Sequence, residues 1–228
     1  KILPEGSLQL ISGSVGDLLD HVTLQDVVTF TGSAQTGLKL KSHPRILAES
    51  VPFNMEADSL NCMVLGDDAK PGTPDFDVFL KEVRKEITVK AGQKCTAVRR
   101  IFVPENYIED FVTGIKKMLS QTTIGNPQVE GVKMGSLAGK AQREEVLEKL
   151  RILQADSEIL YGDQDTLTVV GADKDKGAFI SPFLLFNNKP FDTKSVHEVE
   201  AFGPIATVMP YKTIQEAVAL SQLGKGSL

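Results

Sequence analysis

Short apolar runs alternate with longer segments of helical periodicity along most of the chain. Short runs rich in branched residues and bounded by glycine, proline or polar residues are typical of buried strands, whereas apolar residues spaced three and four apart indicate helices. The alternation predicts an α/β fold with a mainly parallel sheet flanked by helices. Strands are predicted over residues 8–13, 26–33, 99–104, 157–162, 178–186 and 205–211, and helices over residues 15–22, 73–92, 106–121, 141–155 and 213–222.

Two places in this pattern carry more local detail. The first two predicted strands, with the short helix at 15–22 between them, form a βαβ unit. The helix at 73–92 has Thr73 as its N-cap and Pro74 at its first position. That helix delivers the chain to Cys95.

Composition narrows the classes of function. Of 228 residues, 41% are hydrophobic, which is enough for a sizeable core, and the net charge of −5 comes from interspersed acidic and basic residues. Nothing resembles a basic face, so nucleic acid is not expected as a partner. The sequence shows neither a long apolar span nor a leader pattern, so we predict a cytoplasmic protein without membrane contact.

The stretch "FTGSAQTG" is the first candidate for chemistry. Gly32 and Gly37 bracket a turn between a strand and a helix, where glycines let the backbone approach a phosphate and helix amides favour negative charge. An ordinary βα turn explains the same pattern, and taken alone it is the preferred interpretation.

Glu56, in "FNMEADSLN", is the second candidate. It follows a predicted strand or bend and lies between Met55 and Ala57, so desolvation would raise its pKa toward that of a general base. A solvated loop carboxylate is an equal alternative, because Asp58 lies two residues away.

Cys95, in "AGQKCTAVRR", is the third candidate. Arg99 and Arg100 follow it, and a nearby cation lowers a thiol pKa, although a buried structural cysteine is the more common case. Cys62, in "LNCMVLG", fits the structural role. The three histidines lie in no metal-ligand spacing, so we expect no metal; His197 is the best partner for an alternative Cys/His hydrolase.

The order of these motifs is more specific than any one of them. A strand ending in Phe-Thr-Gly-Ser-x-x-x-Gly, then Glu56, then Gly-Gln-x-Cys and finally "EAFGP" resembles the aldehyde dehydrogenase superfamily over essentially the whole chain. The resemblance implies an oxidoreductase that uses NADP or NAD, with residues 1–57 as the C-terminal part of a Rossmann-type cofactor domain. Residues 58–228 would be a catalytic domain that is incomplete at its C-terminal end.

The resemblance also implies residue roles. Cys95 would be the nucleophile that forms a thiohemiacetal and then a thioester, and Glu56 the base that activates water. The implied cofactor contacts are Thr31, Gly32, Ser33 and Gly37 at the pyrophosphate, and Glu200 and Phe202 at the nicotinamide ribose and ring.

One departure narrows the comparison. Residues 56–60 read Glu-Ala-Asp-Ser-Leu where most members have Glu-Leu-Gly-Gly-Lys. With "KAGQKCTAVRR", this resembles the dehydrogenase portion of bifunctional ring-opening enzymes that oxidise a CoA-linked semialdehyde in aerobic phenylacetate degradation. We therefore expect a CoA-linked aldehyde as substrate and a homo-oligomer for the full-length protein. A CoA-acylating or reductase member, and a thiol hydrolase or non-catalytic fragment, are the alternatives. Because the first nucleotide-binding strands are absent, the isolated chain is expected to have little or no activity.

Overall fold

The structure, a computed structural model, describes residues 3–225. The chain divides into two compact units, Lys1–Asp58 and Ser59–Leu228. The assignment of residues 1–57 to a cofactor domain and of residues 58–228 to a catalytic domain stays a prediction. None of the described helices is both long and apolar enough to span a membrane.

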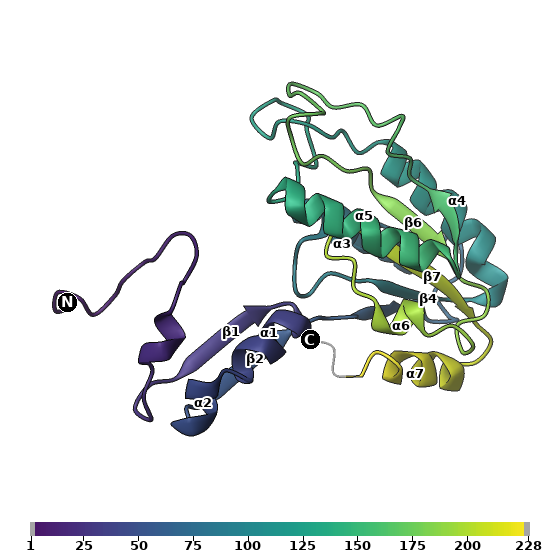
Figure 1. Cartoon of the computed structure of the whole chain (residues 1–228). Coiled ribbons are helices and arrows are strands. Elements are labelled where there is room, and N and C mark those ends of the chain that lie inside the picture. The colour runs from purple at the N-terminus through teal and green to yellow at the C-terminus, as the bar shows by residue number, and fades with distance from the viewer. Residues whose placement is uncertain (1–2, 226–228) are drawn as a thin grey trace. The chain divides into compact units, whose positions relative to one another are not determined.

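The first unit is built around two parallel strands (Figure 1). Its elements are η1 (Leu18–His21), β1 (Val28–Gly32), α1 (Ala34–Lys41), α2 (Pro44–Ala48) and β2 (Phe53–Ala57). Because α1 and α2 connect two parallel neighbours, they complete a βαβ unit. In the register of the pair, Thr31 lies opposite Glu56.

The predicted composition of the βαβ unit was wrong. Residues 8–13 form no strand; they are irregular, and Leu8 and Leu10 are 84% and 94% exposed. A strand requires a neighbour for its backbone hydrogen bonds, and within the described residues β1 pairs with β2. The predicted helix at 15–22 is reduced to the single 3-10 turn η1.

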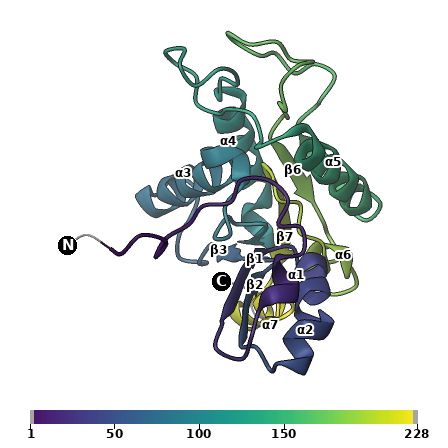
Figure 2. The same ribbon diagram turned by 60° about the vertical axis from the view of Figure 1, so that its left-hand side comes forward.

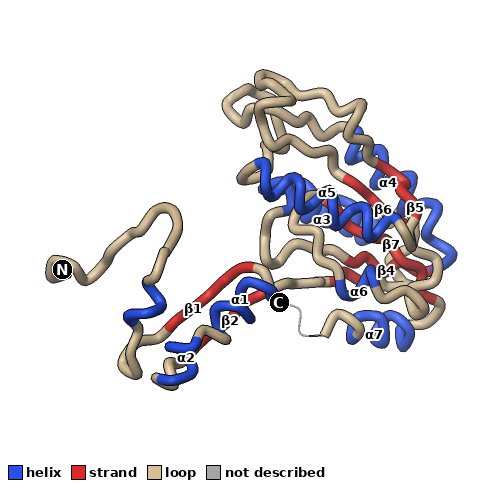
Figure 3. The backbone as a smooth tube through the Cα atoms, in the orientation of Figure 1, coloured by secondary structure: helices blue, strands red, loops and turns tan. Residues whose placement is uncertain are grey.

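The second unit contains a five-stranded sheet in the order β3-β4-β7-β6-β5 (Figure 3). Its strands are β3 (Cys62–Val64), β4 (Arg100–Pro104), β5 (Glu158–Tyr161), β6 (Phe183–Phe186) and β7 (Ile205–Tyr211). All neighbouring pairs are parallel except β5 and β6, which are antiparallel. The predicted α/β fold with a mainly parallel sheet is therefore confirmed. β3 was not predicted, and of the predicted strand at 178–186 only β6 forms.

The helices of this unit are α3 (Pro74–Thr88), η2 (Val89–Gly92), η3 (Glu105–Tyr107), α4 (Ile108–Ser120), α5 (Lys140–Gln154), α6 (Ser195–Glu198) and α7 (Ile214–Gln222). Of these, α3, α4, α5 and α7 lie within the predicted helical segments or differ from them by one residue, whereas α6 was not predicted. Thr73 caps α3 as predicted, with its hydroxyl accepting a hydrogen bond from the Phe76 amide at 3.4 Å.

The sheet of the second unit is covered on both faces, with α3 and α4 on one side and α5 on the other (Figure 2). Along β4, Ile101 and Val103 pack with the α3 and α4 side, and Phe102 packs with the α5 side. This alternation follows from the two-residue period of a strand. It explains why β4 is buried along its whole length.

The order of strands also positions the segments of interest. β4 and β7 are parallel neighbours, with Arg100 opposite Thr207. The residues that precede these strands, around Cys95 and around Glu200, therefore both lie at the N-terminal ends of β4 and β7, at the same end of the sheet.

Candidate active site

Cys95 lies in a turn between η2 and β4, and its side chain is exposed. We call residues 92–99 the Cys95 turn. The turn is entered through three consecutive residues in the left-handed region, Lys90, Ala91 and Gly92, with φ of 53°, 51° and 69°. Such a run reverses the chain at the end of α3, and inside the turn the Ala97 amide donates to the Lys94 carbonyl at 3.1 Å.

Asn61 holds the Cys95 turn at its middle and at its C-terminal end. Its side-chain Nδ2 donates to the Cys95 carbonyl at 2.8 Å. Its backbone carbonyl accepts from the amides of Arg99 and Arg100 at 3.0 and 3.2 Å. Because Asn61 is 8% exposed, these bonds are largely shielded from water and fix the backbone of the turn.

Arg99 connects the Cys95 turn to residues 200–204, which we call the Glu200 segment. Its Nη1 donates to the Gly203 carbonyl at 2.6 Å, and its Nη2 to the Gly92 carbonyl at 2.8 Å. Its Nε lies 3.6 Å from Glu200 Oε1, and its guanidinium carbon lies 5.6 Å from the centre of the Phe202 ring. Burial lowers the pKa of Arg99, and the Glu200 carboxylate opposes that change.

The same two segments touch through their backbones. A Cβ atom placed on Gly92 would lie 2.2 Å from the Gly203 oxygen. A residue with a side chain therefore does not fit at Gly92, which also has a positive φ. Elsewhere in the Glu200 segment, Glu200 Oε2 accepts from the Ser59 amide at 3.1 Å.

A hollow of about 670 Å³ adjoins this arrangement. Phe202, Gln93 and Lys90 are among its lining residues. The Gln93 side-chain oxygen accepts from the Ala138 amide at 2.8 Å, and the Phe202 side chain is 41% exposed. The volume and the exposed aromatic ring suit a flat heterocyclic ligand.

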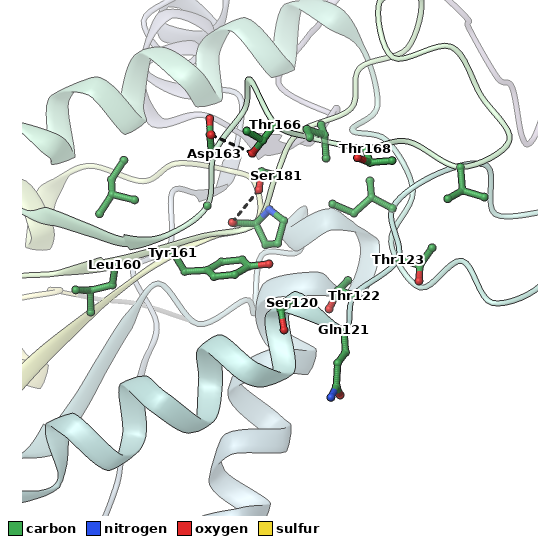
Figure 4. Close-up of a pocket in the computed structure, with 16 residues that line it drawn as sticks. Ser120, Gln121, Thr122, Thr123, Leu160, Tyr161, Asp163, Thr166, Thr168 and Ser181 are labelled. Carbon is green, nitrogen blue, oxygen red and sulfur yellow. Dashed lines mark hydrogen bonds between the residues drawn. The ribbon is translucent and has the colours of Figure 1, made fainter.

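A second hollow, of about 700 Å³, lies beside the edge strand β5 (Figure 4). Hydroxyl groups of Tyr161, Thr166 and Ser181 are among its polar groups. Asp163 accepts bonds from the Asp165 amide and the Thr166 hydroxyl, and these bonds lower its pKa. No predicted site residue lines this second hollow, so it is separate from the Cys95 turn.

The predicted phosphate turn lies in the first unit. Ser33 caps α1, and its hydroxyl accepts from the Thr36 amide at 3.3 Å. The expectation that Gly37 lies in the turn before the helix was wrong, because α1 already begins at Ala34 and Gly37 is buried within it. Asp58 Oδ1 accepts from the Ala34 amide at 3.0 Å.

Glu56 lies within β2 and not after it, and its side chain is exposed. The desolvation predicted from its neighbours is therefore not seen, and Met55 beside it is 39% exposed. The first unit holds Thr31, Gly32, Ser33, Gly37 and Glu56; the second holds Cys95, Glu200 and Phe202. Glu56 and Cys95 thus belong to different units, and their predicted roles stay predictions.

The sequence-based alternative of a Cys95/His197 pair is wrong. His197 is 5% exposed, and its Nε2 lies 2.8 Å from the Pro190 carbonyl. Its Nδ1 lies 3.2 Å from Nη1 of Arg100. Both ring nitrogens therefore have partners other than Cys95.

Sequence reasoning missed the roles of Asn61 and Arg99. Arg99 was noted only as a charge beside Cys95, yet its partner Gly203 lies 104 residues further along the chain. Asn61 ends the stretch "FNMEADSLN", but no role was predicted for it. Both roles depend on contacts between residues far apart in the chain, and the local sequence around each residue does not indicate them.

Comparison with known proteins identifies relatives of the whole chain. The family model described as "Aldehyde dehydrogenase family" matches residues 2–222 of this chain. A 3,4-dehydroadipyl-CoA semialdehyde dehydrogenase of Aromatoleum evansii is 45% identical over 227 residues, which are 100% of this chain and 44% of that protein. The chain thus spans less than half the length of this relative.

Solved structures show the same likeness. A betaine aldehyde dehydrogenase from Staphylococcus aureus, in complex with NAD⁺, matches with a TM-score of 0.76 and 25% identity. The match covers 87% of this chain and 37% of that one. An aldehyde dehydrogenase from Bacillus cereus, also an NAD⁺ complex, matches with a TM-score of 0.73 and 25% identity over 86% of this chain and 37% of its own.

Proposed function

The chain belongs to the aldehyde dehydrogenase family, and we propose that the natural full-length protein carrying it oxidises an aldehyde to a carboxylic acid with NAD(P), through a covalent intermediate on Cys95. The observation that carries this proposal is an exposed cysteine on a turn whose backbone is fixed by Asn61 and Arg99. The turn lies beside an exposed Phe202 ring and a hollow of about 670 Å³.

The residues present fit a dinucleotide. A Cβ atom on Gly37 would lie 2.4 Å from Met55 Sδ, so α1 and β2 pack closely behind the β1–α1 turn. At the N-terminus of α1, the Ala34 amide donates to the Asp58 carboxylate and the Thr36 amide to the Ser33 hydroxyl. A phosphate bound at this helix N-terminus would take the place of the Asp58 carboxylate. Thr31, Gly32 and Ser33 would hold the pyrophosphate. Glu200 and Phe202 would hold the nicotinamide ribose and ring. When bound, the dinucleotide accepts the hydride that leaves the aldehyde carbon.

The chain's own groups perform the remaining steps. The Cys95 thiolate attacks the aldehyde carbon and forms a carbon–sulfur bond, and the carbonyl π electrons move to the oxygen. The backbone N–H of Cys95 is available to stabilise that oxyanion. After oxidation to the thioester, Glu56 removes a proton from water, the resulting hydroxide attacks the acyl carbon, and Cys95 leaves as thiolate. The products are the carboxylic acid and a regenerated nucleophile.

The substrate we propose is a CoA-linked semialdehyde from the breakdown of an aromatic acid, with phenylacetate as the first candidate. The support is the 45% identity over the whole chain to the A. evansii enzyme, whose name specifies a CoA semialdehyde. NADP as the preferred cofactor, assembly as a homo-oligomer and a cytoplasmic location stay predictions.

The test is an assay of the full-length protein with CoA-linked and free semialdehydes. We expect Cys95→Ala to abolish NAD(P) reduction, and Glu56→Gln to allow one turnover and then accumulate an acyl-enzyme detectable by intact-protein mass spectrometry. Unchanged turnover in Cys95→Ala would refute the nucleophile. Rapid thioester hydrolysis in Glu56→Gln would refute the base. With free CoA added, a new CoA thioester at the former aldehyde carbon, in place of a carboxylate there, would identify a CoA-acylating member.

A further inference from the structure

We propose that Arg99 is the positioning residue that holds the Glu200 carboxylate and the Phe202 ring against the Cys95 turn, so that dinucleotide binding depends on it. The inference rests on the proposed function, because it concerns the two residues predicted to contact the nicotinamide end of the cofactor. Arg99 itself contacts no reacting atom.

Two backbone carbonyls hold the guanidinium group of Arg99 in one orientation. Its two terminal nitrogens donate to Gly92 and Gly203, which lie on different segments, and this fixes the plane of the group. With the plane fixed, Nε lies 3.6 Å from Glu200 Oε1 and the guanidinium carbon 5.6 Å from the Phe202 ring centre. One side chain thus contacts both predicted cofactor residues and the Cys95 turn.

Arg99 and Glu200 also interact as two buried side chains of opposite charge. The Arg99 side chain is 4% exposed and that of Glu200 is 10% exposed. Two neutral carbonyls do not offset the cost of burying a guanidinium charge, whereas a neighbouring carboxylate does. The charge of Arg99 therefore constrains where the Glu200 carboxylate lies. The face of the Phe202 ring is drawn to the same cation.

The neighbouring arginine, Arg100, contacts a different set of residues. Arg100 donates to the carbonyls of Leu60 and Leu220 at 2.7 and 2.9 Å and to that of Ser221 at 3.2 Å, so it connects β4 to α7. Its guanidinium also contacts His197 and lies over the Phe102 ring. The two adjacent arginines thus support different places: Arg99 contacts the Glu200 segment, and Arg100 contacts α7.

The variants for the test are Arg99→Met, which removes the charge and the donors, and Arg99→Lys, which keeps the charge but cannot donate to both carbonyls in one plane. Arg143→Met is the matched control, because Arg143 Nε also donates to a backbone carbonyl, that of Phe179, at 2.9 Å. All are measured in the full-length protein, with KM for NAD(P), KM for the aldehyde and kcat determined separately.

We expect Arg99→Met to raise the dissociation constant and KM for NAD(P) by about tenfold, which corresponds to about 1.4 kcal/mol, while KM for the aldehyde changes little. Arg99→Lys should give a smaller rise, and Arg143→Met none. Phe202→Leu should weaken dinucleotide binding less in the Arg99→Met background than in the parent, because the ring has already lost its support. A purely structural role would lower stability without this selective and non-additive effect.

Three outcomes overturn the proposal. One is an NAD(P) dissociation constant in Arg99→Met within about twofold of the parent value. Another is full additivity with Phe202→Leu. If Arg99→Met does not fold, Arg99→Lys decides, and an unchanged KM for NAD(P) in that variant refutes the inference. Cys95→Ala is assayed in parallel: its activity would refute the proposed function, whereas an inactive Cys95→Ala with an unaffected Arg99 variant refutes only the role of Arg99.

Discussion

Replacing Gly92 with alanine tests whether the contact between the Cys95 turn and the Glu200 segment is rigid. The new Cβ would lie 2.2 Å from the Gly203 oxygen, 2.5 Å from its carbonyl carbon and 2.8 Å from the Pro204 nitrogen. All three are backbone atoms, so no side-chain rotation relieves the contact. To reach an ordinary nonbonded distance of about 3.5 Å, the two segments must separate by about 1 Å.

The cost has two parts. Gly92 has a φ of 69°, and an alanine in the left-handed region costs about 1–2 kcal/mol. Forcing extra volume into a packed contact adds about 1–3 kcal/mol. The free energy of unfolding should therefore fall by about 2–5 kcal/mol. A separation of about 1 Å should also lower kcat in the full-length protein by about 100-fold.

The matched control is Gly72→Ala. Gly72 has a φ of 85°, and a Cβ there would meet nothing within 4 Å, so the control carries only the backbone cost. Denaturant unfolding followed by circular dichroism measures both variants, and alkylation of Cys95 followed by peptide mass spectrometry measures the turn. If Gly92→Ala loses no more stability than Gly72→Ala, the contact yields freely and the reasoning is refuted.

Three further predictions concern separate parts of the second unit. Asn61→Ala should lower the free energy of unfolding by about 1 kcal/mol, because the hydrogen bond to the Cys95 carbonyl is lost, and it should also lower kcat. Denaturant unfolding and kcat are measured on the same variant, and an unaltered kcat contradicts a positioning role for Asn61. Thr73→Ala should cost about 1 kcal/mol through loss of the α3 cap and leave Cys95 alkylation unchanged, whereas a changed alkylation rate would show that α3 transmits strain to the turn. Burial lowers the pKa of His197; the positive charge of Arg100 lowers it further, and the hydrogen bond to Pro190 opposes the change. As the pH falls, His197 is therefore protonated in the unfolded chain before it is protonated in the folded protein. The contribution of neutral His197 to the free energy of unfolding should be complete above about pH 6.5 and be lost as the pH falls through the folded pKa. In His197→Gln the free energy of unfolding should therefore fall less steeply with decreasing pH than in the parent. An equally steep fall contradicts the assignment of this pH dependence to His197.

Sequence predicted well those elements whose signals are local. For α3, the cap at Thr73, the proline after it and the apolar spacing all lie within one stretch of chain, and the helix runs over Pro74–Thr88. β7 likewise matches its predicted residues, because a short, continuous apolar run is typical of a strand buried within a sheet. The order of motifs, and not any local pattern, identified the family.

The failures share a different cause. Residues 8–13 have the composition of a strand, but composition supplies no neighbour to pair with. Gly37 was placed in a turn because glycine patterns do not show where a helix begins. The contacts of Asn61 with Cys95 and of Arg99 with Gly203 join residues 34 and 104 positions apart. Such pairs follow from the strand order, which the pattern of apolar residues does not determine.

The adjacency of β4 and β7 has a consequence for the newly made protein. Gly92 and Arg99 are translated long before Gly203, whose carbonyl accepts a hydrogen bond from Arg99 in the folded protein. During that interval the Cys95 turn lacks half of its support, because non-local parallel pairing forms late. The backbone of the Cys95 turn therefore reaches its final conformation only after β7 has been made and has paired with β4.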